Sequence, residues 1–378
     1  MKKRHIALLL VLVLLFLSSC VPKQTANMDI QASIAQLIET KEQSVKNGDL
    51  ELLLSTIDPN DQELQTEQTN WLKDIKDNPV GNYSLKLLKL EETGAGIYKA
   101  KLKQEYTRGD KSYSLDYYNK YLLVGNRLVD AGNYFEVLQQ GNITIDYAPS
   151  AKTLAQGTIE SLNALYQENI KRWKLTPNRP LVIKMFDDVE ELRQSIKLSM
   201  WQCGGWYEYG ESVKILTANR SMSKDQVLNV VGHEMTHLFT VEKAGGNLAY
   251  WFSEGLASYY EGTEGRQSPQ ALRRSMNVKL LTIDELEELE LEKLEDPQQI
   301  SNYYNNAHLI VAYIVENYGE EKLMVILDEL KKKPAYSGTT SENDQYYRAY
   351  LSEILPKELG MRDYEFFKEE WKDEISKL

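Results

Sequence analysis

The sequence predicts an α+β protein with two domains, and three observations support this prediction. The chain has 378 residues, which corresponds to two domains at about 150 residues each. Residues 30–145 begin with helical segments and continue with short strands of alternating polarity, whereas residues 148–378 are mostly helical with a small amount of strand. The hydrophobic share is 42%, which is enough to bury ordinary cores, so wholesale disorder is excluded.

The first residues predict an export signal rather than a part of either domain. Basic residues at positions 2–4 precede a twelve-residue apolar run, 6–17, which is shorter than the roughly 20 residues of a membrane-spanning helix. The ending Leu17-Ser18-Ser19-Cys20 resembles the lipobox of bacterial lipoproteins, whose cysteine is lipidated. That resemblance implies a signal peptide at 1–19, a lipidated Cys20, a tether at 20–29 and a body anchored on the extracytoplasmic face of the cell membrane. An ordinary cleavable signal that ends near a cysteine is the alternative.

Residues 30–145 predict an N-terminal α+β domain. Helical periodicity covers 30–46, and a shorter helix over 50–57 is closed by Asp58-Pro59-Asn60. Helices followed by a meander of strands favour an antiparallel sheet, with strands expected at 84–90, 96–105, 113–124 and 127–137. This order resembles the cone-shaped nuclear-transport-factor-like fold, which implies room for a small ligand or a partner. The sequence of this half contains no catalytic constellation.

Residues 148–378 predict a second, mostly helical domain with a small sheet. Ser223 is the expected N-cap of a helix over 224–240, with Gln226 in capping-box register. The acidic segment 284–296 carries leucines at helical spacing, so its charges are expected on a solvated helix face. The other expected elements before the helical remainder are a helix at 151–173, a strand at 180–186, a helix at 189–198 and a strand at 206–218.

Charge and cysteine content exclude two classes of protein. The net charge of −12, without a basic run after the first residues, excludes the footprint of a nucleic-acid binder. Two cysteines are too few for a disulfide framework. Since Cys20 belongs to the lipobox, Cys203 remains, and a lone thiol is expected to be a small buried hydrophobic group. The oligomeric state is left open by the sequence.

The pattern His233-Glu234-Met235-Thr236-His237 is H-E-x-x-H. On a helix, residues i and i+4 share a face, so both imidazoles can bind one zinc ion with Glu234 beside it. A catalytic zinc takes three protein ligands and keeps one position open. Glu254, seventeen residues after His237 and on the next expected helix, is placed to be the third ligand.

These motifs carry a family resemblance. H-E-M-T-H followed by W-F-S-E-G-L-A resembles the gluzincin metallopeptidases, in particular the peptidase-MA-like group, whose second motif is an aromatic residue followed by E-G-x-A. The similarity extends to a helix at 304–319 with a tyrosine near the metal, and to a closing helix around Trp371 with a buried tryptophan. It implies a zinc endopeptidase that acts on peptides or proteins through a metal-activated water, and the lipobox adds the expected membrane anchor. Glu234 is then the general base, and Tyr304 donates a hydrogen bond to the developing oxyanion.

Several assignments stay open at this point. Tyr303 is a rival of Tyr304, and His308 lies one turn further along the same helix face. Many gluzincins carry an acid four residues after the ligand glutamate, where this chain has Ser258, so Ser258 and Glu261 are both candidates to orient a ligand histidine. The alternative function is a catalytically inactive, peptidase-like lipoprotein that acts as a binding or scaffolding protein. The presence of Glu234 disfavours it, because a scaffold has no need of a general base.

Overall fold

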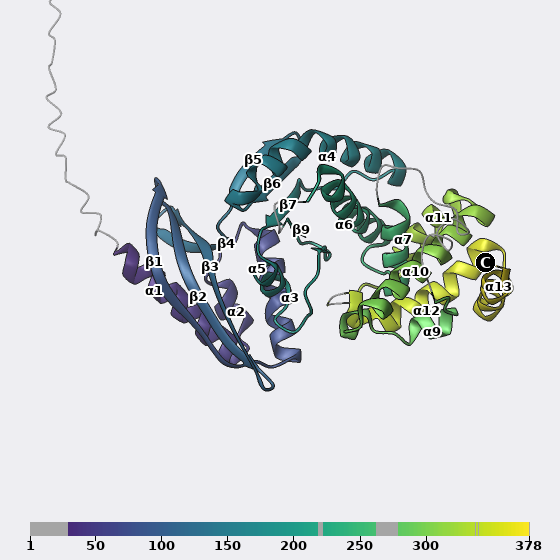
Figure 1. Cartoon of the computed structure of the whole chain (residues 1–378), viewed down its shortest axis with the longest axis horizontal. Helices are drawn as coiled ribbons and strands as arrows, with labels where there is room; N and C mark the ends of the chain where they lie inside the picture. Colours follow the sequence, from purple (N-terminus) through teal and green to yellow (C-terminus); the bar gives the residue numbers. More distant parts are fainter. Residues whose placement is uncertain (1–28, 218–221, 262–278, 337, 339, 378) are drawn as a thin grey trace, which may run out of the picture.

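The computed structural model describes residues 29–217, 222–261, 279–336, 338 and 340–377. Cys20, the expected signal peptide and nearly all of the expected tether therefore lie outside the described residues. Figure 1 shows a sheet covered by helices at one end, a second sheet in the middle and a helical region at the other end. This arrangement confirms the predicted α+β class. Within the described part of the chain, no helix is both long and apolar enough to cross a bilayer.

The N-terminal region consists of three helices and, as predicted, an antiparallel sheet, whose four strands follow the order β1-β2-β3-β4. Three buried side chains, Trp71, Tyr83 and Tyr121, are 2–3% exposed and belong to the core between sheet and helices. The third helix, α3, was not predicted from the sequence. The bounds are α1 Ile30–Asn47, α2 Leu50–Leu54, α3 Gln62–Asp77, β1 Gly81–Gly94, β2 Ile97–Arg108, β3 Lys111–Val124 and β4 Arg127–Asn133.

The second sheet has the order β5-β6-β7-β9-β8. Strands β6, β7 and β9 are parallel, and the edge strands β5 and β8 are antiparallel to their neighbours. The element bounds are β5 Glu136–Gln140, β6 Ile143–Tyr147, the 3₁₀ turn η1 Pro149–Ala151, α4 Lys152–Trp173, β7 Leu181–Phe186, α5 Val189–Ile196, β8 Gly205–Trp206 and β9 Val213–Leu216.

The chain passes from the first sheet to the second earlier than the sequence suggested. The strand expected over 127–137 is divided, since β4 ends at Asn133 and β5 begins at Glu136. Within β4, Gly132 adopts φ 74° and its N–H donates to Asp130 Oδ1 at 2.9 Å, where the pairing with β3 shifts its register. β5 and β6 then pair with each other and with β7. The expected division at 145–148 therefore falls at the end of β6, within the second sheet, and not between the two sheets.

The remaining helices form the C-terminal half of the molecule. Trp371 is 1% exposed and its Nε1–H donates to Leu281 O at 3.1 Å, in agreement with the expected closing helix. The acidic segment is helical over Ile283–Glu287 and continues as a 3₁₀ turn. The bounds are α6 Lys224–Ala244, α7 Tyr250–Tyr260, α9 Ile283–Glu287, η2 Leu291–Lys293, α10 Pro297–Tyr318, α11 Glu320–Leu330, α12 Thr340–Leu359 and α13 Tyr364–Lys377.

The acidic segment corrects one expectation, since its charges do not form a wholly solvated helix face. Glu287 Oε1 accepts hydrogen bonds from Trp251 Nε1 at 3.2 Å and from Tyr364 Oη at 2.9 Å. Glu292 Oε2 forms an ion pair with Lys197 Nζ at 2.9 Å. These carboxylates therefore hold the helical half together and tie it to the end of α5.

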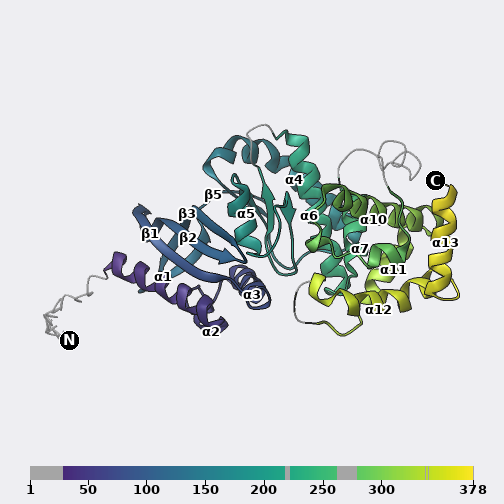
Figure 2. The same ribbon diagram turned by 60° about the horizontal axis from the view of Figure 1, so that its bottom comes forward.

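Helix α3 joins the N-terminal region to the second sheet, and it lies beside α5 in both views (Figures 1 and 2). Trp71 Nε1–H donates to Gln194 O at 2.9 Å, and Lys184 of β7 binds Glu67 of α3 at 2.8 Å. Gln104 of β2 donates to the Gln194 side chain at 2.8 Å. Because Trp71, Glu67, Gln104 and Gln194 are buried and Lys184 is half-buried, the contact is a packed interface between the two regions.

Candidate metal centre

Helix α6 forms where the sequence predicted it. The Ser223 side chain accepts from Gln226 N–H while the Gln226 side chain accepts from Ser223 N–H, a complete capping box, and Gly245 ends the helix in the left-handed conformation at φ 64°. His233 and His237 lie one turn apart on the same face. The intervening residues need no special conformation, because the helix alone places the two rings together.

Helix α7 brings Glu254 to the same point by packing closely on α10. A Cβ at Gly255 would lie 2.8 Å from Val311 Cγ2 and 2.9 Å from the Ala307 carbonyl carbon. At these distances the atoms would clash. Glycine at this position therefore permits the two helices to touch and sets the depth of Glu254 in the site. The glycine of the E-G-L-A motif thus has a packing role.

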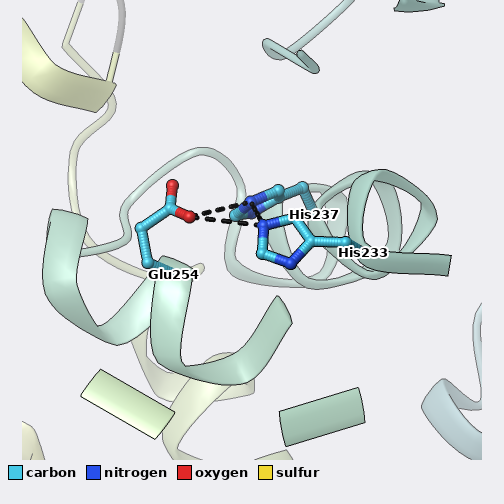
Figure 3. A group of neighbouring side chains, drawn as sticks. All are labelled: His233, His237 and Glu254. Carbon is cyan, nitrogen blue, oxygen red and sulfur yellow. Dashed lines mark hydrogen bonds and ion pairs between the residues drawn. The ribbon is translucent and has the colours of Figure 1, made fainter. Parts of the chain in front are cut away.

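The three predicted ligand atoms converge (Figure 3). His233 Nε2 lies 3.3 Å from His237 Nε2, and Glu254 Oε2 lies 3.4 Å and 3.5 Å from these two nitrogens. Zinc bonds of about 2.0–2.2 Å in a tetrahedron require ligand atoms about 3.3–3.5 Å apart, so the three positions fit one tetrahedral zinc ion. Glu254 Oε2 is buried and accepts no hydrogen bond from the described residues, as expected of an atom that faces a cation.

The opposite nitrogen of each imidazole is held by a second side chain. Glu261 Oε2 lies 2.7 Å from His233 Nδ1, and Ser253 Oγ lies 3.0 Å from His237 Nδ1. Contacts of this kind fix the ring orientation and leave Nε2 free to coordinate. Glu261 therefore takes the orienting position that the sequence left open, whereas the Ser258 backbone hydrogen-bonds His308. Sequence reasoning missed Ser253, although it directly precedes Glu254.

Replacing Glu261 by Ala is expected to weaken zinc affinity by about 10- to 100-fold, the usual cost of removing a group that orients a ligand histidine. The measurement is competition of the protein with a chelator of known zinc affinity. Glu288→Ala serves as the matched control, because Glu288 is an exposed carboxylate of the acidic segment and is not part of the candidate metal site. Equal zinc affinity of the Glu261→Ala variant and the wild type would contradict the orienting role.

Glu234 lies beside the three ligands and is 6% exposed. Burial raises its pKa, an effect that the neighbouring His233 and His237 oppose. By contrast, burial would also raise the pKa of Glu254, but the two histidines lower it to about 2. The two carboxyl groups of the site are therefore shifted in opposite directions, which suits one for proton transfer and the other for coordination.

Strand β8 packs its backbone directly on Glu234. A Cβ at Gly205 would lie 3.1 Å from both Cγ and Cδ of Glu234, whereas a Cβ at Gly204 would meet nothing within 4 Å. Neither residue has a positive φ. Glycine at position 205 is therefore needed for space, and the strand in turn fixes where the carboxylate lies.

The contact of Gly205 with Glu234 predicts that Gly205→Ala lowers kcat for the expected peptide hydrolysis by about 100-fold. Displacing a reacting group by about 1 Å has an effect of that order. Zinc content should not change, because Gly205 does not touch the three ligands. Gly204→Ala is the matched control and is expected to keep the wild-type rate. A Gly205→Ala enzyme with unchanged kcat would show that the position of Glu234 tolerates displacement.

The lining of the pocket around the ligands distinguishes Tyr304 from its two rivals, Tyr303 and His308. Tyr304 lines it, with its ring centroid 6.0 Å from that of His233. Tyr303 is 2% exposed and packs on Tyr250, and His308 packs on Tyr259, so neither of the two rivals lines this pocket. Residues that sequence reasoning had not assigned to the site also line it: Met200, Trp201, Tyr250 and Glu292.

Cys203 lines the same pocket as a free and buried thiol. Burial raises the pKa of this thiol to about 12, and Glu234 adds to the shift. The group is therefore protonated at neutral pH, in line with the expected small buried hydrophobic side chain.

A comparison with protein families agrees with this geometry. Residues 164–350 match the family model described as the Peptidase MA superfamily. The matched segment contains α6, α7 and α10, and therefore the three converging ligands, Glu234 and Tyr304. Among curated proteins, none matches the chain.

Proposed function

Because residues 164–350 form a domain of the Peptidase MA superfamily and hold a candidate metal site of the H-E-x-x-H-plus-Glu pattern, we propose that the chain is a membrane-anchored, zinc-dependent endopeptidase. The observation that carries the proposal is the 3.3–3.5 Å spacing of the three ligand atoms. Two imidazoles and one carboxylate are a donor set that suits zinc. When bound, zinc lowers the pKa of water and polarises the carbonyl of the bond to be cut.

The chain's own side chains supply the proton transfers. Glu234 takes a proton from the attacking water and later delivers it to the leaving amine. Tyr304 donates a hydrogen bond to the oxygen on which negative charge develops. Both residues line the same pocket as the three ligands, which is the geometry that these roles require.

The substrate of such an enzyme is a peptide segment in extended form. β8 stands at the edge of the second sheet and lies against Glu234, so an extended peptide can add to this edge through backbone hydrogen bonds. The pocket beside the ligands is small, about 50 Å³, and Glu292 of its lining is ion-paired with Lys197 at the end of α5.

Anchoring at the membrane rests on the N-terminal sequence. The apolar run at 6–17 and the lipobox ending at Cys20 support a lipid-modified N-terminus on the extracytoplasmic face. Incorporation of labelled palmitate into the wild type, and its loss in Cys20→Ser, is the expected result. Labelling that persists in the variant would contradict the assignment of Cys20.

The proposed activity is tested by metal removal and restoration. The purified chain is stripped with a chelator, reloaded with one equivalent of zinc, and incubated with an unfolded protein, whose fragments are identified by mass spectrometry. We expect hydrolysis at internal peptide bonds with zinc, and loss of hydrolysis without it. Stoichiometric zinc binding without hydrolysis under any of these conditions would instead favour the scaffolding alternative.

A further inference from the structure

The chain between α5 and β8, residues 197–204, adopts no regular secondary structure. Three of its side chains line the pocket around the metal ligands: Met200, Trp201 and Cys203. The segment continues into Gly205, whose backbone packs on Glu234. This connecting segment therefore forms part of the pocket wall and leads directly to the proposed general base.

The beginning of the same segment belongs to the N-terminal region. Leu198 is 0% exposed and lies in the hydrophobic core that also contains Trp71 and Tyr83. Met200 follows closely in the chain but belongs to a separate core, together with Phe186 of β7. The segment therefore passes from the core of the N-terminal region to the metal pocket within a few residues.

Ser199 is the residue at which the N-terminal region binds this segment. Asp74 of α3 accepts a hydrogen bond from the Ser199 backbone N–H at 3.1 Å, and a second one from the Ser199 hydroxyl. Arg108 of β2 donates from Nη1 to the Ser199 carbonyl oxygen. All three polar groups of Ser199 are thus bound by charged side chains of the N-terminal region, and hydrogen bonds with a charged partner are among the stronger ones in proteins.

The carbonyl groups on either side of Ser199 are bound by Arg193 of α5. Its Nη1 donates to Leu198 O at 3.0 Å and to Met200 O at 3.4 Å. Its Nη2 donates to Tyr106 Oη of β2 at 2.8 Å, so this arginine is itself attached to the N-terminal sheet. Because the segment is not part of a helix or a sheet, these side chains supply the partners of its backbone and determine its path.

We infer that Asp74 and Arg108 are positioning residues of the proposed peptidase site, because they fix Ser199 and, through it, the pocket wall and the strand that packs on Glu234. The N-terminal region is then a working part of the active site and not only a neighbouring domain. The catalytic consequence rests on the proposed function, whereas the attachment of the segment can be measured without it.

Cys203 reports on the attachment of the segment independently of catalysis. Its free thiol is 8% exposed, so an alkylating reagent reaches it mainly when the segment opens locally. The full, zinc-loaded chain is treated with iodoacetamide, and mass spectrometry follows alkylation of the peptide that contains Cys203. We expect Asp74→Ala, which removes two hydrogen bonds, to speed alkylation by about tenfold or more, and Ser199→Ala, which removes one, by about threefold.

Hydrolysis of a fluorogenic peptide by the same preparations measures the catalytic consequence. Asp74→Ala is expected to lower kcat by about tenfold, because the displacement of Glu234 is indirect and therefore smaller than the 1 Å that costs about 100-fold. Zinc content should stay at the wild-type level, since Asp74 does not contact the three ligands. A loss of folded protein alone would lower zinc content and activity together.

Two replacements of the same type are the controls. Asp77→Ala changes an exposed aspartate at the end of the same helix, and it should alter neither alkylation nor kcat. Asp130→Ala removes a carboxylate that is buried like Asp74 but pairs with Lys41 at 3.3 Å, within the N-terminal region. It is expected to lower the free energy of unfolding and to keep kcat within about twofold of the wild-type value.

The outcomes separate the positioning role from the proposed activity. Unchanged alkylation of Cys203 in both Asp74→Ala and Ser199→Ala would overturn the positioning role, even if the wild type hydrolyses the peptide. Faster alkylation with an unchanged kcat would overturn it as well. Faster alkylation in both variants of a chain whose wild type has no hydrolytic activity would support the attachment of the segment and refute the peptidase function.

Discussion

Replacing Glu234 by Gln is expected to lower the rate of peptide hydrolysis by about 10³-fold, within the range of 10²–10⁴ typical of a general base. Zinc content should stay at one ion per chain, because Glu234 is not one of the three converging ligands. Glutamine fills the same space against the β8 backbone but cannot accept a proton. The measurement is zinc stoichiometry and hydrolysis of an unfolded protein, made on the same preparations.

Glu242→Gln is the matched control for this prediction. Glu242 lies on the same helix, about two turns beyond Glu234, and contacts Arg179 at 3.8 Å rather than the metal ligands. Its replacement is expected to change hydrolysis by less than twofold. Full activity of the Glu234→Gln variant would move the base to another residue, and loss of zinc from that variant would give Glu234 a structural role in place of a chemical one.

The ligand set could be predicted from the sequence because it depends on local geometry. Helical spacing alone unites His233 and His237, and a short connection returns Glu254 to them. The orienting residues depend on how α6 and α7 cross, which is a non-local property. Glu261 lies just past the end of α7, and no helical period fixes its direction. The sequence could therefore offer Ser258 and Glu261 but could not choose between them.

The fold shows the same division between local and non-local information. Helix α3 was predictable in principle, since Asp61 caps it and Leu64, Trp71 and Ile75 recur at helical spacing on its buried face. The separation of β4 from β5 could not be predicted, because alternating polarity indicates a strand but does not identify the strand that it pairs with. β6 pairs with β7, which follows it in the chain only after α4. This pairing therefore joins residues that are far apart in the sequence.

Glu67→Gln is expected to destabilise the chain by about 3–5 kcal/mol, the usual effect of removing one partner of a buried ion pair. Glu67 binds Lys184 at 2.8 Å and Lys214 at 3.3 Å, and it accepts a hydrogen bond from Ser212. Burial would raise the pKa of Glu67, but the two ammonium groups lower it well below its ordinary value. Its contribution is therefore present above the unfolded-state pKa of 4.5 and is lost as the pH falls further.

Urea denaturation at pH 7 and in acid measures the free energy of unfolding of the wild type and of Glu67→Gln. The difference between these two free energies should be smaller in acid than at pH 7. Glu91→Gln is the matched control, because the Glu91–Lys89 pair is exposed, at 42% and 63%, and its loss should leave the free energy of unfolding close to that of the wild type. An equal loss of stability in the two variants would mean that the buried network does not hold the interface.

The same substitution is expected to lower kcat at temperatures where the variant is still folded. Lys214 lies on β9 opposite Trp206 of β8, and the adjacent Gly205 backbone packs on Glu234. Loosening β9 therefore displaces the strand that packs on Glu234, the proposed general base. For this reason α3 supports the region that carries the candidate metal site, and deleting residues 29–145 would leave Lys184 and Lys214 without Glu67. Unchanged kcat in folded Glu67→Gln would limit the interface to a role in stability.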